Sequence, residues 1–89
     1  MIGITIEHAE ILRWTAARGG RPVLRSENVE IPAISFEQEH HNRPVSWDHW
    51  LSAFDRGEFA LIYQDATGNG ELSRFCRIVP RFANVAAAA

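Results

Sequence analysis

Apolar and polar positions alternate with a helical period in two stretches of the chain. The first helix is expected from about Ile6 to Arg18, with Thr5 as its N-cap and glutamates near the positive end of its dipole. Gly19 and Gly20 end it, because glycine readily leaves the helical conformation. One face of this helix carries the positions that follow helical spacing, namely His8, Ile11, Leu12, Trp14 and Thr15.

The second helical stretch opens at Ser46, with Asp48 in its first turn. Its large apolar residues fall at i, i+3, i+4 and i+7, which is the spacing of one buried stripe. The alternative interpretation is a binding face of tryptophans. A chain of 89 residues buries only roughly two-thirds of its unfolded surface, so its bulky side chains are needed in the core. We therefore expect a core stripe formed by Trp47, Trp50, Leu51 and Phe54.

Four further stretches are short, rich in branched residues and bounded by turn formers, which is typical of strands. They cover residues 21–27, 31–37, 59–65 and 72–79. The glycine-rich residues 66–70 predict a hairpin turn between the last two strands, and Pro80 ends the last one.

These elements predict a small single α+β domain over residues 1–82, with the order α-β-β-α-β-β. Two helices are expected to pack on one face of an antiparallel sheet. Residues 83–89, mostly alanine, are expected to form a disordered or vector-derived tail outside the domain.

Composition and charge limit the classes of function. The formal net charge is −2, which argues against a duplex-binding protein that relies on nonspecific attraction to phosphate. No apolar run approaches the roughly 18 residues of a membrane span, and the first residues lack the basic start and cleavage site of a secretion signal. A single cysteine, Cys76, excludes an internal disulfide. We therefore expect a cytoplasmic protein with no membrane partner.

Candidate chemistry is sparse. His40 and His41, with His49 a few residues later, resemble metal ligands in type, but their spacing matches no standard zinc site. The serines lie in no nucleophile motif, and the aspartates occupy a helix cap, a helix surface and a strand end. The "GNG" of residues 68–70 joins two strands, whereas a phosphate-binding glycine loop opens a helix. The sequence therefore predicts a protein that is not an enzyme and that holds no metal and no cofactor.

The last strand offers the remaining candidate surface. Alternation places Phe75 and Arg77 on one face, and Arg74 on the other with Cys76 and Ile78. If the first strand lies beside it, its arginines extend a basic patch interleaved with aromatic residues. The alternative is that these arginines only keep a sheet edge soluble. The candidate binding residues are Arg21, Arg25, Tyr63, Arg74, Phe75, Arg77 and Arg81.

Three segments together resemble a family of small bacterial proteins: "HAEILRWTAARGGRP", "SWDHWLSAFDRGEFALIYQD" and "SRFCRIV". Family members share a helix ending in Trp and a Gly-Gly-x-Pro turn, a Ser-Trp helix, a Leu-Ala-Leu-x-Tyr-Gln strand and a closing Ser-x-Phe strand. The resemblance covers residues 8–22 and 46–79, about two-thirds of the chain, and residues 23–43 depart from the pattern.

Some members of that family carry the label of a glucan-branching enzyme. Such enzymes resemble barrel hydrolases of roughly 250 residues, and 89 residues cannot build that barrel. The resemblance therefore implies a fold and a bacterial origin, and it implies no catalytic residue.

Two hypotheses of function follow. The first is a non-catalytic interaction module, such as a small bacterial or phage adaptor or inhibitor, which binds a protein partner or itself through an exposed sheet face or edge. The second is an accessory protein that contacts nucleic-acid phosphates through the arginine patch.

Overall fold

The order of elements is β-α-β-β-β-α-β-β in the computed structural model, which describes residues 2–25, 30–37 and 42–81. One antiparallel sheet joins β1 (Ile2–Thr5), β5 (Phe59–Gln64) and β6 (Cys76–Pro80), in that order. A second antiparallel sheet joins β3 (Ile31–Ser35), β2 (Arg21–Arg25) and β4 (Arg43–Pro44). The predicted tail, residues 83–89, lies outside the described residues.

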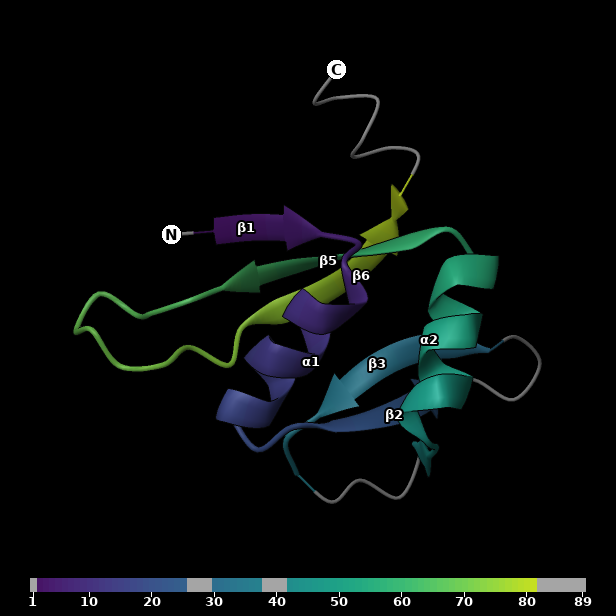
Figure 1. The fold of residues 1–89 in the computed structure, drawn as a ribbon. Helices are drawn as coiled ribbons and strands as arrows, with labels where there is room; N and C mark the ends of the chain where they lie inside the picture. The colour runs from purple at the N-terminus through teal and green to yellow at the C-terminus, as the bar shows by residue number, and fades with distance from the viewer. Residues whose placement is uncertain (1, 26–29, 38–41, 82–89) are drawn as a thin grey trace.

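The α+β class is confirmed, and the prediction of one sheet is wrong. Helices α1 (His8–Ala17) and α2 (Trp47–Arg56) lie on the same side of both sheets, toward the viewer in Figure 1. The two sheets adjoin where β6 and β3 run side by side, but no strand pairing joins these two edges in the described part of the chain. The strand layer is therefore split along its middle.

The start of the chain also differs from the prediction. Residues Ile2–Thr5 form a strand that pairs with β5, from Ile2 opposite Gln64 to Thr5 opposite Leu61. The helix begins later, at His8, and Thr5 is not its cap; the Thr5 hydroxyl accepts a hydrogen bond from the Glu7 amide at 3.0 Å. Ile2 and Ile4 alternate with smaller residues, which favours a strand. Pairing with β5 stabilises this strand over an earlier start of the helix. The two-residue strand β4 was also not predicted.

The second helix follows the prediction closely. The Ser46 side chain accepts a hydrogen bond from the His49 amide at 3.1 Å and caps the helix. Trp50 and Phe54 are fully buried and join Ile11 of α1 and Leu61 of β5 in the hydrophobic core. Trp47 and Leu51 are half-buried and pack against that cluster. The predicted stripe is therefore core rather than an exposed binding face.

The hairpin between β5 and β6 is confirmed, although the last strand begins at Cys76 rather than at residue 72. Backbone hydrogen bonds close the long connection, from Thr67 N to Glu71 O at 2.8 Å and from Ser73 N to Asp65 O at 3.2 Å. Gly70 adopts a φ of 84°, a conformation that favours glycine. Neither helix of the described chain has the length and apolar character that crossing a membrane requires.

Candidate functional site

The face of the β1–β5–β6 sheet that points away from the helices is the main candidate site. Strand register places Ile4, Ile62 and Arg77 in one row across the three strands, because Ile4 lies opposite Ile62 and Ile62 opposite Arg77. The opposite face carries Leu61, which belongs to the core. Alternation then assigns the remaining residues of what we call the outer sheet face: Ile2, Ile4, Ala60, Ile62, Gln64, Phe75, Arg77 and Val79.

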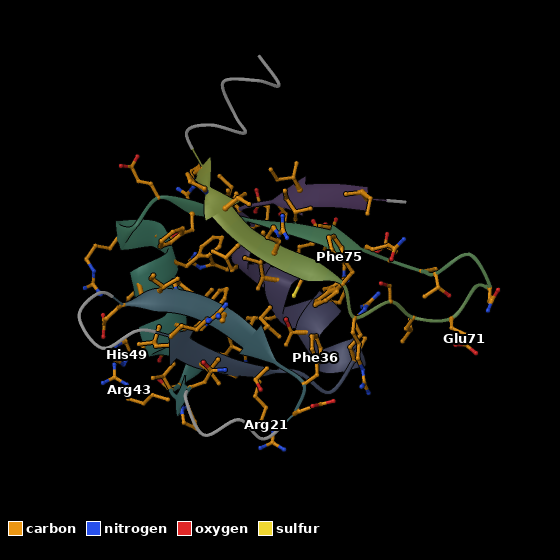
Figure 2. All side chains as sticks on the ribbon, turned by 180° about the vertical axis from the view of Figure 1, so that it is seen from behind. Arg21, Phe36, Arg43, His49, Glu71 and Phe75 are labelled. Carbon is orange, nitrogen blue, oxygen red and sulfur yellow. The ribbon has the colours of Figure 1, made fainter. Side chains whose placement is uncertain are left out.

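The outer sheet face exposes large apolar side chains. Ile2 is 56% exposed, and Ile4 and Phe75 are each 48% exposed. Ile62, which lies between Ile4 and Arg77, is half-buried, and so is Val79, which lies beyond Arg77 on β6 opposite Ala60. Figure 2 shows the strand side of the molecule, with the helices behind the strands and Phe75 next to the start of β6. Neither helix covers this face, and Ile2, Ile4 and Phe75 are its most exposed apolar side chains among the described residues, whereas Ala60 on the same face is fully buried.

A groove adjoins the outer sheet face along the split between β6 and β3. Its volume is about 260 Å³. The walls combine apolar side chains with two arginines, one from each sheet, and the lining residues are Arg25, Ile31, Pro32, Ala33, Ile34, Cys76, Arg77 and Ile78. Because Arg77 belongs to both, the groove and the outer sheet face form one continuous surface.

The two arginines of the groove differ from some other arginines of the chain in their charge partners. Arg25 and Arg77 are exposed, and neither forms an ion pair with a described residue. Among the described residues, ion pairs join Arg43 and Arg56 to Glu30, and Arg81 to Asp55. The groove therefore combines apolar side chains with two arginines that have no acidic partner among the described residues.

The structure brings together only part of the predicted patch. Arg25, Arg77 and Phe75 share the outer sheet face or its groove. Arg21 lies at the other end of β2 and, in Figure 2, projects away from β6. Arg74 precedes β6, and its guanidinium lies 5.6 Å from the centre of the Phe36 ring, away from the groove residues.

Arg81 and Tyr63 have roles inside the fold. Arg81 donates to the Phe59 carbonyl at 3.0 Å and to the Asp55 carboxylate at 3.2 Å, which ties the end of β6 to α2. Tyr63 lies opposite Cys76 in the ladder and so faces the helices rather than the outer sheet face. Its hydroxyl donates to Glu10 of α1. This hydrogen bond, with burial and the charge of Glu10, raises the pKa of Tyr63 to about 12.

Tyr63 borders a second hollow, of about 450 Å³, between α1 and the β5–β6 hairpin. Its walls mix aromatic, acidic and basic side chains, among them Trp14, Glu10, Arg13 and Asp65. Acidic and basic side chains therefore share one wall of this hollow.

Of the three histidines His40, His41 and His49 that resemble metal ligands in the sequence, the structure describes only His49. His40 and His41 lie outside the described residues. His49 bonds to the Glu30 carboxylate at 2.9 Å, and this hydrogen bond, aided by the charges of His49, Arg56 and Arg43, lowers the pKa of Glu30. Within residues 2–25, 30–37 and 42–81, no three of His, Cys, Asp and Glu lie close enough together to hold a metal ion.

Cys76 lines the groove with a thiol that burial makes unreactive. Burial raises the pKa of Cys76 from 9.0 to about 11, although the charge of Arg18 opposes this shift. Since the thiolate is the nucleophile, a rise of two units lowers the reactive fraction at pH 8 about a hundredfold.

We expect iodoacetamide at pH 8 to alkylate native Cys76 about a hundredfold more slowly than the same residue in the urea-unfolded chain. Mass spectrometry of timed samples measures both rates, and the chain has no other cysteine to complicate them. Equal rates in the two states would contradict the packing of Cys76 that the structure describes.

Sequence reasoning missed the apolar half of the outer sheet face. The predicted helix with its cap at Thr5 left Ile2 and Ile4 outside every predicted strand. The signal was present, because Ile2, Ile4 and Ile6 alternate with other residues at the period of a strand.

Comparisons with known proteins do not extend this picture. The chain matches no family model, no curated protein and no solved structure.

Proposed function

We propose that this protein is a non-catalytic interaction module, a small adaptor or inhibitor, that binds a protein partner through the outer sheet face and its groove. The exposed isoleucines and Phe75 around Arg77 are the observation that carries the proposal. A partner that fits this surface presents apolar side chains to the isoleucines and carboxylates to Arg25 and Arg77.

The apolar side chains support a protein partner. Ile2, Ile4 and Phe75 are each about half exposed on one face of one sheet. Contiguous apolar patches on small soluble domains mark interaction sites, whereas single exposed apolar residues are ordinary. Covering three such side chains and their neighbours Ile62 and Val79 supplies the apolar centre of an interface.

The charges support a partner with acidic side chains around that centre. Arg25 and Arg77 come from different sheets but line one groove, and neither has an acidic partner among the described residues. Arginine is enriched in interfaces because its planar guanidinium bonds carboxylates in pairs. A carboxylate placed between the two arginines would use this geometry.

The pairing of Phe75 with Arg77 on one face favours a second candidate, an accessory protein that binds single-stranded nucleic acid. Phe75 would stack on a base while the arginines contact phosphates. This candidate is weaker, because the face carries one exposed aromatic ring and the chain has a net charge of −2.

Affinity capture with matched variants tests the proposed function. Wild type, Arg77→Glu and Arg13→Glu are immobilised and exposed to a bacterial lysate treated with nuclease. Arg13 is an exposed residue of α1 on the helix side, so its variant changes the net charge equally without touching the outer sheet face. We expect a protein captured by wild type and Arg13→Glu to be lost with Arg77→Glu.

Titration of the captured protein should then give at least a tenfold weaker affinity for Arg77→Glu than for Arg13→Glu, about 1.4 kcal/mol. Equal affinities would refute the use of this surface. Binding of single-stranded oligonucleotides by wild type, weakened by Arg77→Glu and lost steeply between about 50 and 200 mM salt, would establish the second candidate instead.

A further inference from the structure

The free edge of β1 carries an inference that does not depend on the proposed use of the outer sheet face. In the order β1-β5-β6, strand β1 is outermost, and within the described part of the chain it pairs with β5 alone (Figure 1). An edge strand presents unpaired backbone N–H and C=O groups that can pair with another chain.

The ladder settles which groups point outward. Gln64 N bonds to Phe75 O and Arg81 N bonds to Glu58 O, so the even-numbered residues of β5 bond toward β6. The odd-numbered residues Leu61 and Tyr63 therefore bond toward β1, where their partners are Thr5 and Gly3.

It follows that Ile2 and Ile4 direct their N–H and C=O groups away from the sheet. These two residues together offer two donors and two acceptors along the free edge.

The other described edges are protected and β1 is not. Strands β6, β3 and β4 each form one edge of a sheet, and they contain Pro80, Pro32 and Pro44 respectively. Proline on an edge strand removes a donor and discourages pairing with another chain. Strand β1, with the sequence IGIT, has neither a proline nor a charged side chain. The edge of β1 therefore lacks the proline that discourages the other edge strands from pairing with another chain.

The outward groups of β1 are complementary to themselves. Two copies related by a two-fold axis at Gly3 place Ile2 of each opposite Ile4 of the other, and each such pair exchanges two hydrogen bonds. All four outward groups of each strand are then used. Gly3 meets Gly3 of the second copy at a non-hydrogen-bonded position, where Cα atoms approach to about 4.5 Å.

This register also suits the side chains. Ile2 and Ile4 are exposed on the outer sheet face, and pairing brings four isoleucines from two copies into one cross-strand cluster. No charge on β1 opposes the approach of an identical strand. We propose that the chain forms a homodimer by antiparallel pairing of β1 with β1 of a second copy, giving a six-stranded sheet β6-β5-β1-β1-β5-β6.

The interface of such a dimer is small. Stable interfaces bury roughly 1,600 Å² in total, and a four-residue edge with four isoleucines buries well under this area. We therefore expect a dissociation constant on the order of 10–100 μM, so that the dimer forms at high local concentration.

Sedimentation equilibrium between about 5 μM and 1 mM tests the proposal, a range that spans the expected dissociation constant. Wild type should shift from the monomer mass of 10.0 kDa toward twice that value as concentration rises. Ile4→Pro removes the outward N–H but none that bonds β5, so it should fold and remain monomeric. Ile4→Val keeps both the N–H and a branched side chain and should still dimerise.

Amide hydrogen exchange of the wild-type chain tests the same pairing without a variant, and so it applies even if Ile4→Pro does not fold. The Ile2 and Ile4 amides of wild type should exchange freely at low concentration and become protected at high concentration, while the Gly3 amide stays protected throughout. A monomer at all concentrations, or exchange independent of concentration, would overturn the proposal. So would a dimer that survives Ile4→Pro and is lost with Arg77→Glu, since that dimer would pack through the outer sheet face.

Discussion

Replacing Trp50 with alanine is expected to lower the free energy of unfolding by about 3–5 kcal/mol, the range for large buried aromatic residues. Trp50 is fully buried, its ring stacks on Phe54 at 5.1 Å between centroids, and it meets Trp47 edge-on at 5.2 Å. Its indole N–H donates to the Ala33 carbonyl at 2.9 Å, which joins α2 to β3. Alanine leaves a cavity and removes this link between a helix and the second sheet.

Urea unfolding followed by circular dichroism measures the loss. Trp47→Ala serves as a matched control, because Trp47 lies on the same helix but is only half-buried, and it should cost less. Trp50→Phe separates the two contributions, since it keeps most of the ring volume and removes the N–H; we expect it to cost about 1–2 kcal/mol. A Trp50→Ala variant as stable as wild type that had lost its partner would make Trp50 a contact residue and refute its place in the core.

Replacing Arg18 with methionine is expected to cost about 2–4 kcal/mol, because one buried cation satisfies three backbone carbonyls. Arg18 caps the C-terminal end of α1 and is only 9% exposed. Its guanidinium donates to the Trp14 carbonyl at 2.9 Å, to the Asp65 carbonyl at 2.7 Å and to the Ser73 carbonyl. It also lies 4.4 Å from the centre of the Trp14 ring.

This arginine connects α1 to both ends of the long β5–β6 connection, and the positive charge stands where the helix dipole is negative. Methionine keeps the length of the side chain and its apolar stem but leaves the carbonyls without a donor.

Thermal or urea unfolding gives the change for Arg18→Met. Arg13→Met, at an exposed position of α1 five residues before Arg18, should stay within about 0.5 kcal/mol of wild type. Faster amide exchange confined to residues 65–75 would accompany the loss. An Arg18→Met variant as stable as Arg13→Met would show that these three hydrogen bonds contribute nothing net.

Local signals in the sequence were enough for the second helix. Ser46 before an apolar stripe at helical spacing predicts both the cap and the buried side, and neither depends on distant residues. The run from Phe59 to Gln64 predicted a buried strand for the same reason, since branched and aromatic residues in a short apolar run have few alternatives.

Local signals at the start of the chain conflicted. Thr5 followed by glutamates indicates a helix cap, while Ile2 and Ile4 alternate as in a strand. Pairing with β5 stabilises the strand over the helix start. This partner lies about 60 positions later in the chain, so the residues near Thr5 could not predict it.

Which residues share the candidate site also depends on the strand register, which the sequence does not predict. Tyr63 and Phe75 are near neighbours on adjacent strands, but Tyr63 is opposite Cys76, and this one-residue difference puts it on the helix side. Arg81 looked free in the sequence and is held by Asp55 and the Phe59 carbonyl. Neither fact is visible until the register and the position of α2 are known.

By itself, then, the sequence determined the class of the domain, its two helices, its buried stripe and most of its strands, because these follow from residue period and local propensity. Only the tertiary structure decided that the strand layer is split between β6 and β3, that β1 exists, and which arginines form ion pairs with other described residues. Those features come from hydrogen bonds and ion pairs between residues far apart in the chain, and such partners are chosen by the geometry of the whole fold.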